Sequence, residues 1–125
     1  MTEGGTMTGA ALIRWGAQVP GREAKSLEVF GRSIERFEQL AKEGRIHAHR
    51  EYIALTGRAG GFTILEGEVE ELQKILVEPE TLALNTQAEA IVTDFEITLY
   101  AGGTDKAVQD LIGTYMAAIG DLGYM

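Results

Sequence analysis

Four polar or aromatic residues on predicted strands have side chains that could bind or transform a ligand: Arg14, Trp15, Glu96 and Tyr100. A half-buried arginine can hold a carboxylate or enolate in a bidentate fork, and a tyrosine can donate a proton or a hydrogen bond. Arg14, Glu96 and Tyr100 lie opposite the apolar alternation of their segments, so we expect them on one face of a sheet. They are candidate catalytic residues, or Arg14 and Glu96 form a structural ion pair at a subunit interface. Trp15 shares the apolar parity of Ile13, which favours a place in the core.

Two histidines, His47 and His49, lie on one side of another predicted strand, with Glu51 next in line. A single histidine titrates near neutral pH and can act as an acid or a base, so both are candidate catalytic residues. Two histidines and a carboxylate can also bind iron or zinc, but such sites usually draw their ligands from separate elements. We therefore expect no metal here, and a solvated edge strand is the plain alternative.

The elements that would position these groups begin with a strand and a long helix. Residues 10–19 place Ile13, Trp15, Ala17 and Val19 at a spacing of two, the pattern of a strand with one buried face. Pro20-Gly21 turns the chain. Residues 22–43 then carry apolar side chains at steps of three and four, which predicts an amphipathic helix that ends at Gly44.

The rest of the chain supplies three strands and three helices. The predicted strands span 46–56, 62–65 and 94–100, and the predicted helices span 69–78, 81–92 and 104–120. The glycine-rich segment 57–61 predicts a hairpin turn, and Pro79 separates the first two of these helices. The parity of 46–56 is ambiguous, because Ile53 and Leu55 share it with the histidines; a bulge or a strand that runs past the helix layer would explain this.

This order predicts a βαββαβ arrangement with an additional C-terminal helix. Right-handed crossovers joined by a hairpin give a four-stranded antiparallel sheet with helices on one face. The opposite face, predicted from Leu12, Thr63, Leu65, Thr98 and Tyr100, would lack a cover. A second copy of the chain would cover it, so we predict a homodimer whose two sheets enclose a lumen. The last helix would pack on its own sheet edge or on the partner.

The element order, the Glu78-Pro79-Glu80 break and the closing strand 94–100 resemble the dimeric α+β-barrel, ferredoxin-like superfamily. This superfamily includes antibiotic-biosynthesis-type monooxygenases, muconolactone isomerases and YCII-like proteins. The resemblance covers residues 10–120 and implies an α+β homodimer that binds or transforms a small organic molecule in its lumen, by oxygenase or isomerase chemistry without a cofactor. A non-catalytic ligand-binding or assembly protein is the alternative, because one fold hosts many functions.

Composition sets the remaining limits. The 125 residues suit one domain, which we place at 10–125 after a disordered lead of residues 1–9. The net charge of −8 argues against nucleic acid and anionic membranes as partners. The chain has no cysteine, which excludes disulfides and thiolate metal sites and fits a cytoplasmic location.

Overall fold

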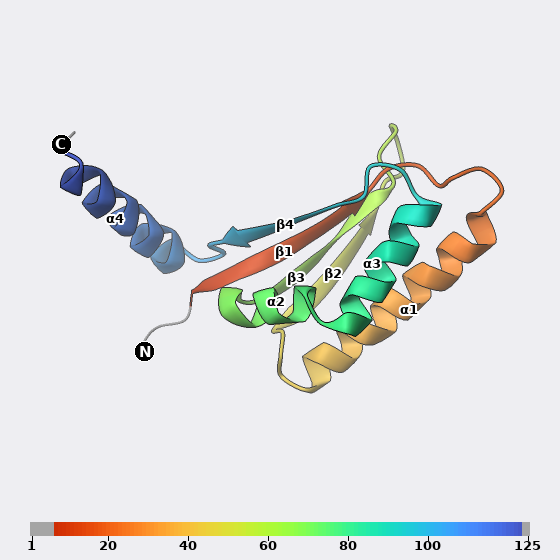
Figure 1. The fold of residues 1–125 in the computed structure, drawn as a ribbon, viewed down its shortest axis with the longest axis horizontal. Helices are drawn as coiled ribbons and strands as arrows, with labels where there is room; N and C mark the ends of the chain where they lie inside the picture. Colours follow the sequence, from red (N-terminus) through yellow and green to blue (C-terminus); the bar gives the residue numbers. More distant parts are fainter. Residues whose placement is uncertain (1–6, 124–125) are drawn as a thin grey trace.

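The computed structural model describes residues 7–123. Its four-stranded antiparallel sheet has the strand order β2-β3-β1-β4, and α1, α2 and α3 lie on one side of it (Figure 1). The elements are β1 (Thr8–Trp15), α1 (Glu23–Lys42), β2 (Ala48–Ile53), β3 (Gly61–Glu68), α2 (Val69–Leu76), α3 (Pro79–Ile91), β4 (Glu96–Ala101) and α4 (Asp105–Asp121). The predicted α+β βαββαβ order is confirmed, and β1 and β3 are the central strands.

β1 begins earlier and ends earlier than its sequence pattern predicts. Thr8 and Gly9 already pair with β3, so the predicted lead is two or more residues too long, and its residues 1–6 lie outside the described part. At the other end, β1 stops at Trp15, and Gln18 forms only an isolated bridge with Val92. Gly9 is required where it lies, because a Cβ there would come 2.1 Å from the carbonyl oxygen of Tyr100.

The alternation of β1 assigns the side chains of the whole sheet to its two faces. Ala11 and Ile13 are buried beneath the helices, and Leu12 and Arg14 point to the other side. Cross-strand partners share a face, and the register pairs Ala11 with Leu65 and Leu99, and Ile13 with Thr63 and Ile97. Of these residues, Ala11, Ile13, Leu65, Ile97 and Leu99 form the hydrophobic layer beneath the helices together with Leu40, Leu72 and Ile75.

The prediction that Thr63 and Leu65 belong to the uncovered face is therefore wrong. They are only 2% and 1% exposed, because their register partners in β1 are Ile13 and Ala11. Phe62 and Ile64 take their place on what we call the open face. Leu12, Thr98 and Tyr100 lie on the open face as predicted.

A cluster of ion pairs fixes the junction between α2 and α3. Glu78 is extended, which Pro79 favours, and it accepts hydrogen bonds from Arg45 (Nη2 to Oε2, 2.6 Å) and Arg36 (Nη2 to Oε1, 2.8 Å). Arg45 also donates to Glu71 in α2 (2.6 Å). These bonds connect the start of α3 to α1, through Arg36, and to the loop after α1, through Arg45. α3 is thereby held against α1.

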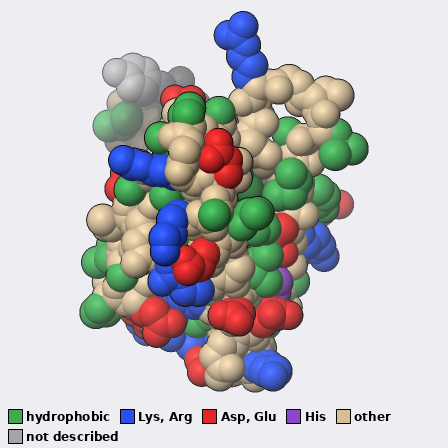
Figure 2. Space-filling view, turned by 90° about the vertical axis from the view of Figure 1, so that its right-hand side faces the viewer, with side chains coloured by type: hydrophobic (Ala, Val, Ile, Leu, Met, Phe, Trp, Pro, Cys, Tyr) green, Lys and Arg blue, Asp and Glu red, His purple; other side chains and the backbone are tan. Residues whose placement is uncertain are grey.

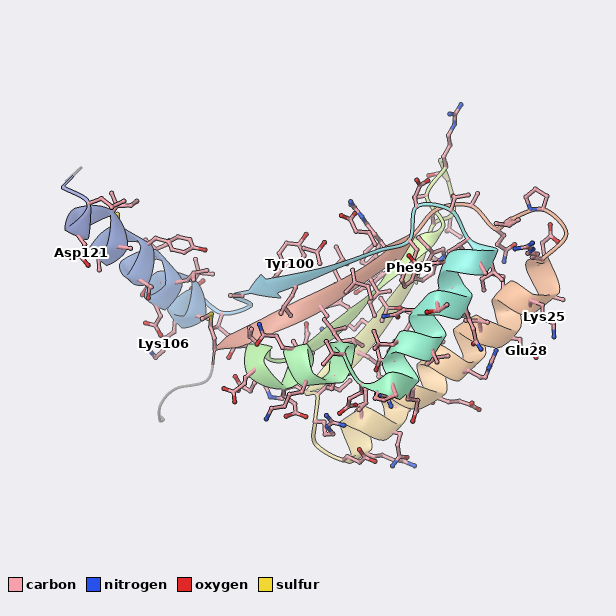
Figure 3. All side chains as sticks on the ribbon, viewed as in Figure 1. Lys25, Glu28, Phe95, Tyr100, Lys106 and Asp121 are labelled. Atoms are coloured by element: carbon pink, nitrogen blue, oxygen red, sulfur yellow. The ribbon has the colours of Figure 1, made fainter. Side chains whose placement is uncertain are left out.

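The last helix, α4, leaves the sheet after β4 and extends away from it (Figure 1). Thr104 is the N-cap of α4, because its hydroxyl accepts a hydrogen bond from the Ala107 amide (3.1 Å). None of the described residues of α4 is buried, so packing on its own sheet edge, one of the two predicted possibilities, is not seen. In Figure 3 its side chains, between the labelled Lys106 and Asp121, project with no other described element beside them.

The Glu78 cluster makes stability depend on acid pH. Hydrogen bonds from Arg45, and then Arg36, lower the pKa of Glu78 below its ordinary value of 4.5. A lowered pKa contributes stability that is present above pH 4.5 and is lost as the pH falls through the folded-state value. We expect Glu78→Gln to lower Tm at pH 7 and the difference from wild type to shrink below pH 4.5, measured by circular dichroism. A difference that is the same at pH 7 and pH 3.5 would contradict this.

Candidate functional site

A cavity of about 490 Å³ lies between the sheet and the pair α1 and α3. Its volume is in the range of sites that bind small organic molecules. β1 and β3 form its floor, and the two helices form its walls. The lining includes Ile13, Trp15, Thr63 and Leu65 from the sheet, Ser26, Leu27, Val29, Phe30, Ser33, Arg36 and Phe37 from α1, Ile75 and Leu76 from α2, Thr81, Leu84, Asn85, Ala88 and Ile91 from α3, and Gln18, Ile53 and Phe95 from other segments.

The cavity forms because the side chains of α1 and α3 do not fill the space between these helices and the sheet. α2 packs on β1, β3 and β4 through Leu72 and Ile75, whereas α3 packs mainly on α1. The cavity-facing side of α3 repeats at helical spacing and includes the short Ala88, and that of α1 includes Ser26 and Ser33. Longer side chains at these positions would close the space.

Aromatic rings line much of the wall. The rings of Trp15 and Phe30 are 5.5 Å apart and inclined by 60°, and Phe37 and Phe95 also line the cavity. Trp15 lies over the backbone of Gly60, where an added Cβ would be 2.4 Å from Trp15 Cδ1. Trp15 thus packs on the helix side of the sheet, as predicted, and its ring also forms part of the cavity wall.

The cavity opens toward the loop between β2 and β3. Two lining residues at this end, Leu27 and Ile53, are 67% and 57% exposed. By spacing, Leu27 begins the apolar stripe of residues 22–43, but its side chain is exposed, and Ser26 and Val29 are the buried residues in this part of α1. Figure 2 views this end of the molecule, with hydrophobic side chains in its upper part beside the loop and charged side chains gathered below.

The polar groups of the cavity were not among the sequence candidates. Gln18 Nε2 donates to Ser26 Oγ (3.2 Å), and Arg36 donates to Thr81 Oγ1 (3.0 Å from Nε). Thr63, Asn85 and Ser33 also contribute polar groups to the lining. The signal available in the sequence was small polar residues at helical spacing inside an apolar stripe, as with Ser26 and Ser33 next to Phe30 and Phe37.

His49 and Glu51 form a pair on the helix-covered side of β2, next to the cavity. His49 Nδ1 is 2.7 Å from Glu51 Oε2, both side chains are mostly buried, and the imidazole lies 6.1 Å from the ring of Phe37. Phe37 lines the cavity, but the pair itself does not. No bulge interrupts the pairing of β2 with β3, so the ambiguous parity arises because the strand runs past the helix layer, where Ile53 and Leu55 are exposed.

His47 lies apart from that pair. It precedes β2, and its Nε2 is 4.0 Å from Glu68 Oε1. Within residues 7–123 there is no cluster of histidine and carboxylate side chains that could hold a metal ion. The two histidines therefore do not act together in the described structure.

Arg14, Glu96 and Tyr100 lie on the open face. Arg14 and Glu96 are paired as predicted, with Arg14 Nε 2.7 Å from Glu96 Oε1, and both are more than half exposed. Tyr100 lies on the same face of β4, and Figure 3 places it on the side away from α1–α3. The sheet separates these three residues from His49, so the chain does not bring the five candidate residues together. Their catalytic role stays a prediction.

Comparison with known proteins supports the fold. No protein-family model and no curated protein matches the chain. One similar solved structure is SnoaB, a cofactor-independent oxygenase from Streptomyces nogalater, with 16% identity, a TM-score of 0.56, and coverage of 80% of this chain and 96% of that one. Another is a dimeric protein of unknown function with a ferredoxin-like fold from Bacteroides fragilis, with 14% identity, a TM-score of 0.56, and coverage of 76% and 96%.

These similarities and the strand order show a ferredoxin-like α+β fold. At these identities they establish the fold alone. The narrower YCII-like assignment stays a prediction. No helix in the described part of the chain is long and apolar enough to cross a membrane.

The contact between Gly60 and Trp15 gives a test of the cavity wall. In Gly60→Ala the new methyl would meet Gly16 O at 2.0 Å as well as the indole, so we expect a loss of about 1–3 kcal/mol and a shifted Trp15 emission spectrum. Gly31→Ala in α1 is the control, since nothing lies within 4 Å of its Cβ; it should stabilise by about 0.5–1 kcal/mol. Urea unfolding and fluorescence measure both. Unchanged stability and emission in Gly60→Ala would contradict the described wall.

Proposed function

We propose that this protein binds a small, largely apolar organic molecule in the cavity between the sheet and the pair α1 and α3. The observation that carries the proposal is the cavity itself: a space of about 490 Å³ lined by aromatic and aliphatic side chains, with a few polar groups and an opening beside Leu27. An empty apolar space of that size destabilises a core, so its retention is best explained by a ligand that fills it. This places the ligand on the helix side of the sheet rather than in a lumen between two sheets.

A narrower form of this proposal is that the protein transforms the ligand by oxygenase or isomerase chemistry without a bound cofactor. One observation favours it: SnoaB, a cofactor-independent oxygenase, shares the fold. The predicted catalytic residue His49, paired with Glu51, lies next to the cavity rather than in its lining. A non-catalytic ligand-binding protein is the alternative. Oxygen uptake and mass spectrometry of a bound ligand distinguish the two: turnover that His49→Gln abolishes supports catalysis, and an unchanged ligand supports binding alone.

We further propose that the protein is a homodimer, with a second copy covering the open face and α4. The open face carries a stacked pair, Tyr52 and Phe62, with ring centroids 5.0 Å apart, beside Leu12 and Ile64. α4 adds an apolar stripe whose large side chains are exposed by 40–71%: Val108, Ile112, Tyr115, Met116, Ile119 and Leu122. Exposed apolar surface of this extent marks an interface.

The polar candidates of the open face have a role in this proposal. Arg14 with Glu96, and Arg50 with Glu66, would lie in the interface, where paired charges fix the orientation of the two copies. Tyr100 would extend the apolar contact. The solved structure from Bacteroides fragilis is a dimer, which supports the same assembly here. A cytoplasmic location, with neither nucleic acid nor membrane as partner, stays a prediction.

Filling the cavity should abolish binding. Ala88 lines the cavity from α3, so Ala88→Phe would occupy the space and weaken binding of a neutral aromatic ligand by more than about tenfold. Ala83→Phe is the matched control, because Ala83 lies on the exposed side of the same helix and should leave affinity unchanged. Quenching of Trp15, the single tryptophan, reports binding. Equal affinity in wild type and Ala88→Phe would place the ligand elsewhere.

A charge on the apolar stripe of α4 should weaken the dimer. Ile112→Asp would bury an unpaired carboxylate in the proposed interface, so we expect its dissociation constant to rise at least about tenfold. Thr114→Asp adds the same charge on the polar side of α4 and should have little effect. Sedimentation velocity between 1 and 100 µM, concentrations chosen to span about micromolar affinity, measures both. A wild-type protein that is monomeric throughout would refute the homodimer.

A further inference from the structure

We infer that the cavity selects uncharged ligands, an inference that rests on the proposed function and narrows it to neutral aromatic molecules with hydroxyl or carbonyl groups. The argument begins with charge. Among the described residues, Arg36 is the one charged side chain in the lining. Its side chain is only 10% exposed, so it lies in the wall between α1 and α3. Whether it can bind an anionic ligand depends on what its guanidinium already contacts.

All three nitrogens of the Arg36 guanidinium already have oxygen partners within the protein. Nε and Nη2 donate to Thr81 Oγ1 (3.0 and 2.8 Å), and Nη2 also donates to Glu78 Oε1 (2.8 Å). Nη1 is 2.9 Å from Glu80 Oε2. Two carboxylates therefore balance this cation, and its donors point along the wall to the start of α3. An anionic ligand would have to displace one of them.

The remaining polar groups of the cavity are neutral. Gln18, Ser26, Ser33 and Asn85 offer amide and hydroxyl groups, which suit a phenol, alcohol or ketone. Transferring a carboxylate or sulfonate from water into such a site leaves a charge without a counter-ion, and that cost is large. The aromatic side chains Trp15, Phe30 and Phe37 favour flat rings through stacking and edge contacts. The ligand class is therefore a neutral aromatic molecule.

Two probes with the same aromatic skeleton test this inference: N-phenyl-1-naphthylamine, which is neutral, and 8-anilinonaphthalene-1-sulfonate, which is anionic. We expect the neutral probe to quench Trp15 with at least about tenfold higher affinity than the anionic probe, and Ala88→Phe to abolish the quenching. Circular dichroism confirms that Ala88→Phe is folded, and Ser33→Phe, which fills the cavity from α1, replaces it if it is not. Ala83→Phe checks that the probe does not bind the outer side of α3. Anion binding that is equal or tighter, and lost in Ala88→Phe, overturns the inference. Quenching by neither probe overturns the proposed function instead.

A second variant tests the role of Arg36 directly. Glu80→Gln removes one of its two carboxylate partners, and the Glu80 side chain is largely exposed, so the fold should tolerate the change. We expect the anionic probe to bind at least about threefold more tightly and the neutral probe to bind as in wild type. Glu89→Gln, which makes the same change on the exposed side of α3, is the control and should alter neither. No gain for the anion in Glu80→Gln would show that Arg36 does not set the selectivity.

Discussion

The side chains of the central strand β1 alternate between the two faces of the sheet, and the rest of the molecule depends on this alternation. β1 is hydrogen-bonded to β3 on one side and to β4 on the other, so the direction of its side chains sets the face of every partner. Ala11 and Ile13 lie toward the helices, and Leu12 and Arg14 away from them. A slip of one residue would exchange the two sets, bury Arg14 and expose the core. One strand thereby separates a cavity side from an open side.

The helix side acquires its hollow from the way α3 is held. Arg36 and Arg45 fix Glu78, and Glu78 with Pro79 determines where α3 begins. α3 therefore packs on α1, while α2 packs on β1, β3 and β4. The same ion pairs that create the space also occupy the cation in its wall. The carboxylates that position α3 thus also set the proposed preference for neutral ligands, because they leave Arg36 with little capacity to bind an anion.

The sequence predicts the elements better than it predicts their faces. The break at Pro79 and the N-cap at Thr104 are local signals, and each lies where the structure has it, whereas the period of two finds β1 but misplaces both of its ends. In β3, Phe62 and Ile64 alternate as well as Thr63 and Leu65 do, so only the register with β1 decides which pair is buried. The cavity was missed for a related reason. No single residue encodes an unfilled space, and the sequence indicates the cavity only through short lining side chains such as Ser33 and Ala88.

Two neighbouring residues of β2 test most directly whether the faces serve separate purposes. Tyr52 lies on the open face and Ile53 at the mouth of the cavity; both are about half exposed, and the chain has no cysteine of its own. Maleimide labelling rates of Tyr52→Cys and Ile53→Cys would be measured with and without N-phenyl-1-naphthylamine and at low and high protein concentration. The account predicts that the ligand slows labelling only at position 53, and that concentration slows it only at position 52. Ligand protection at position 52, or equal responses at both positions, would contradict it.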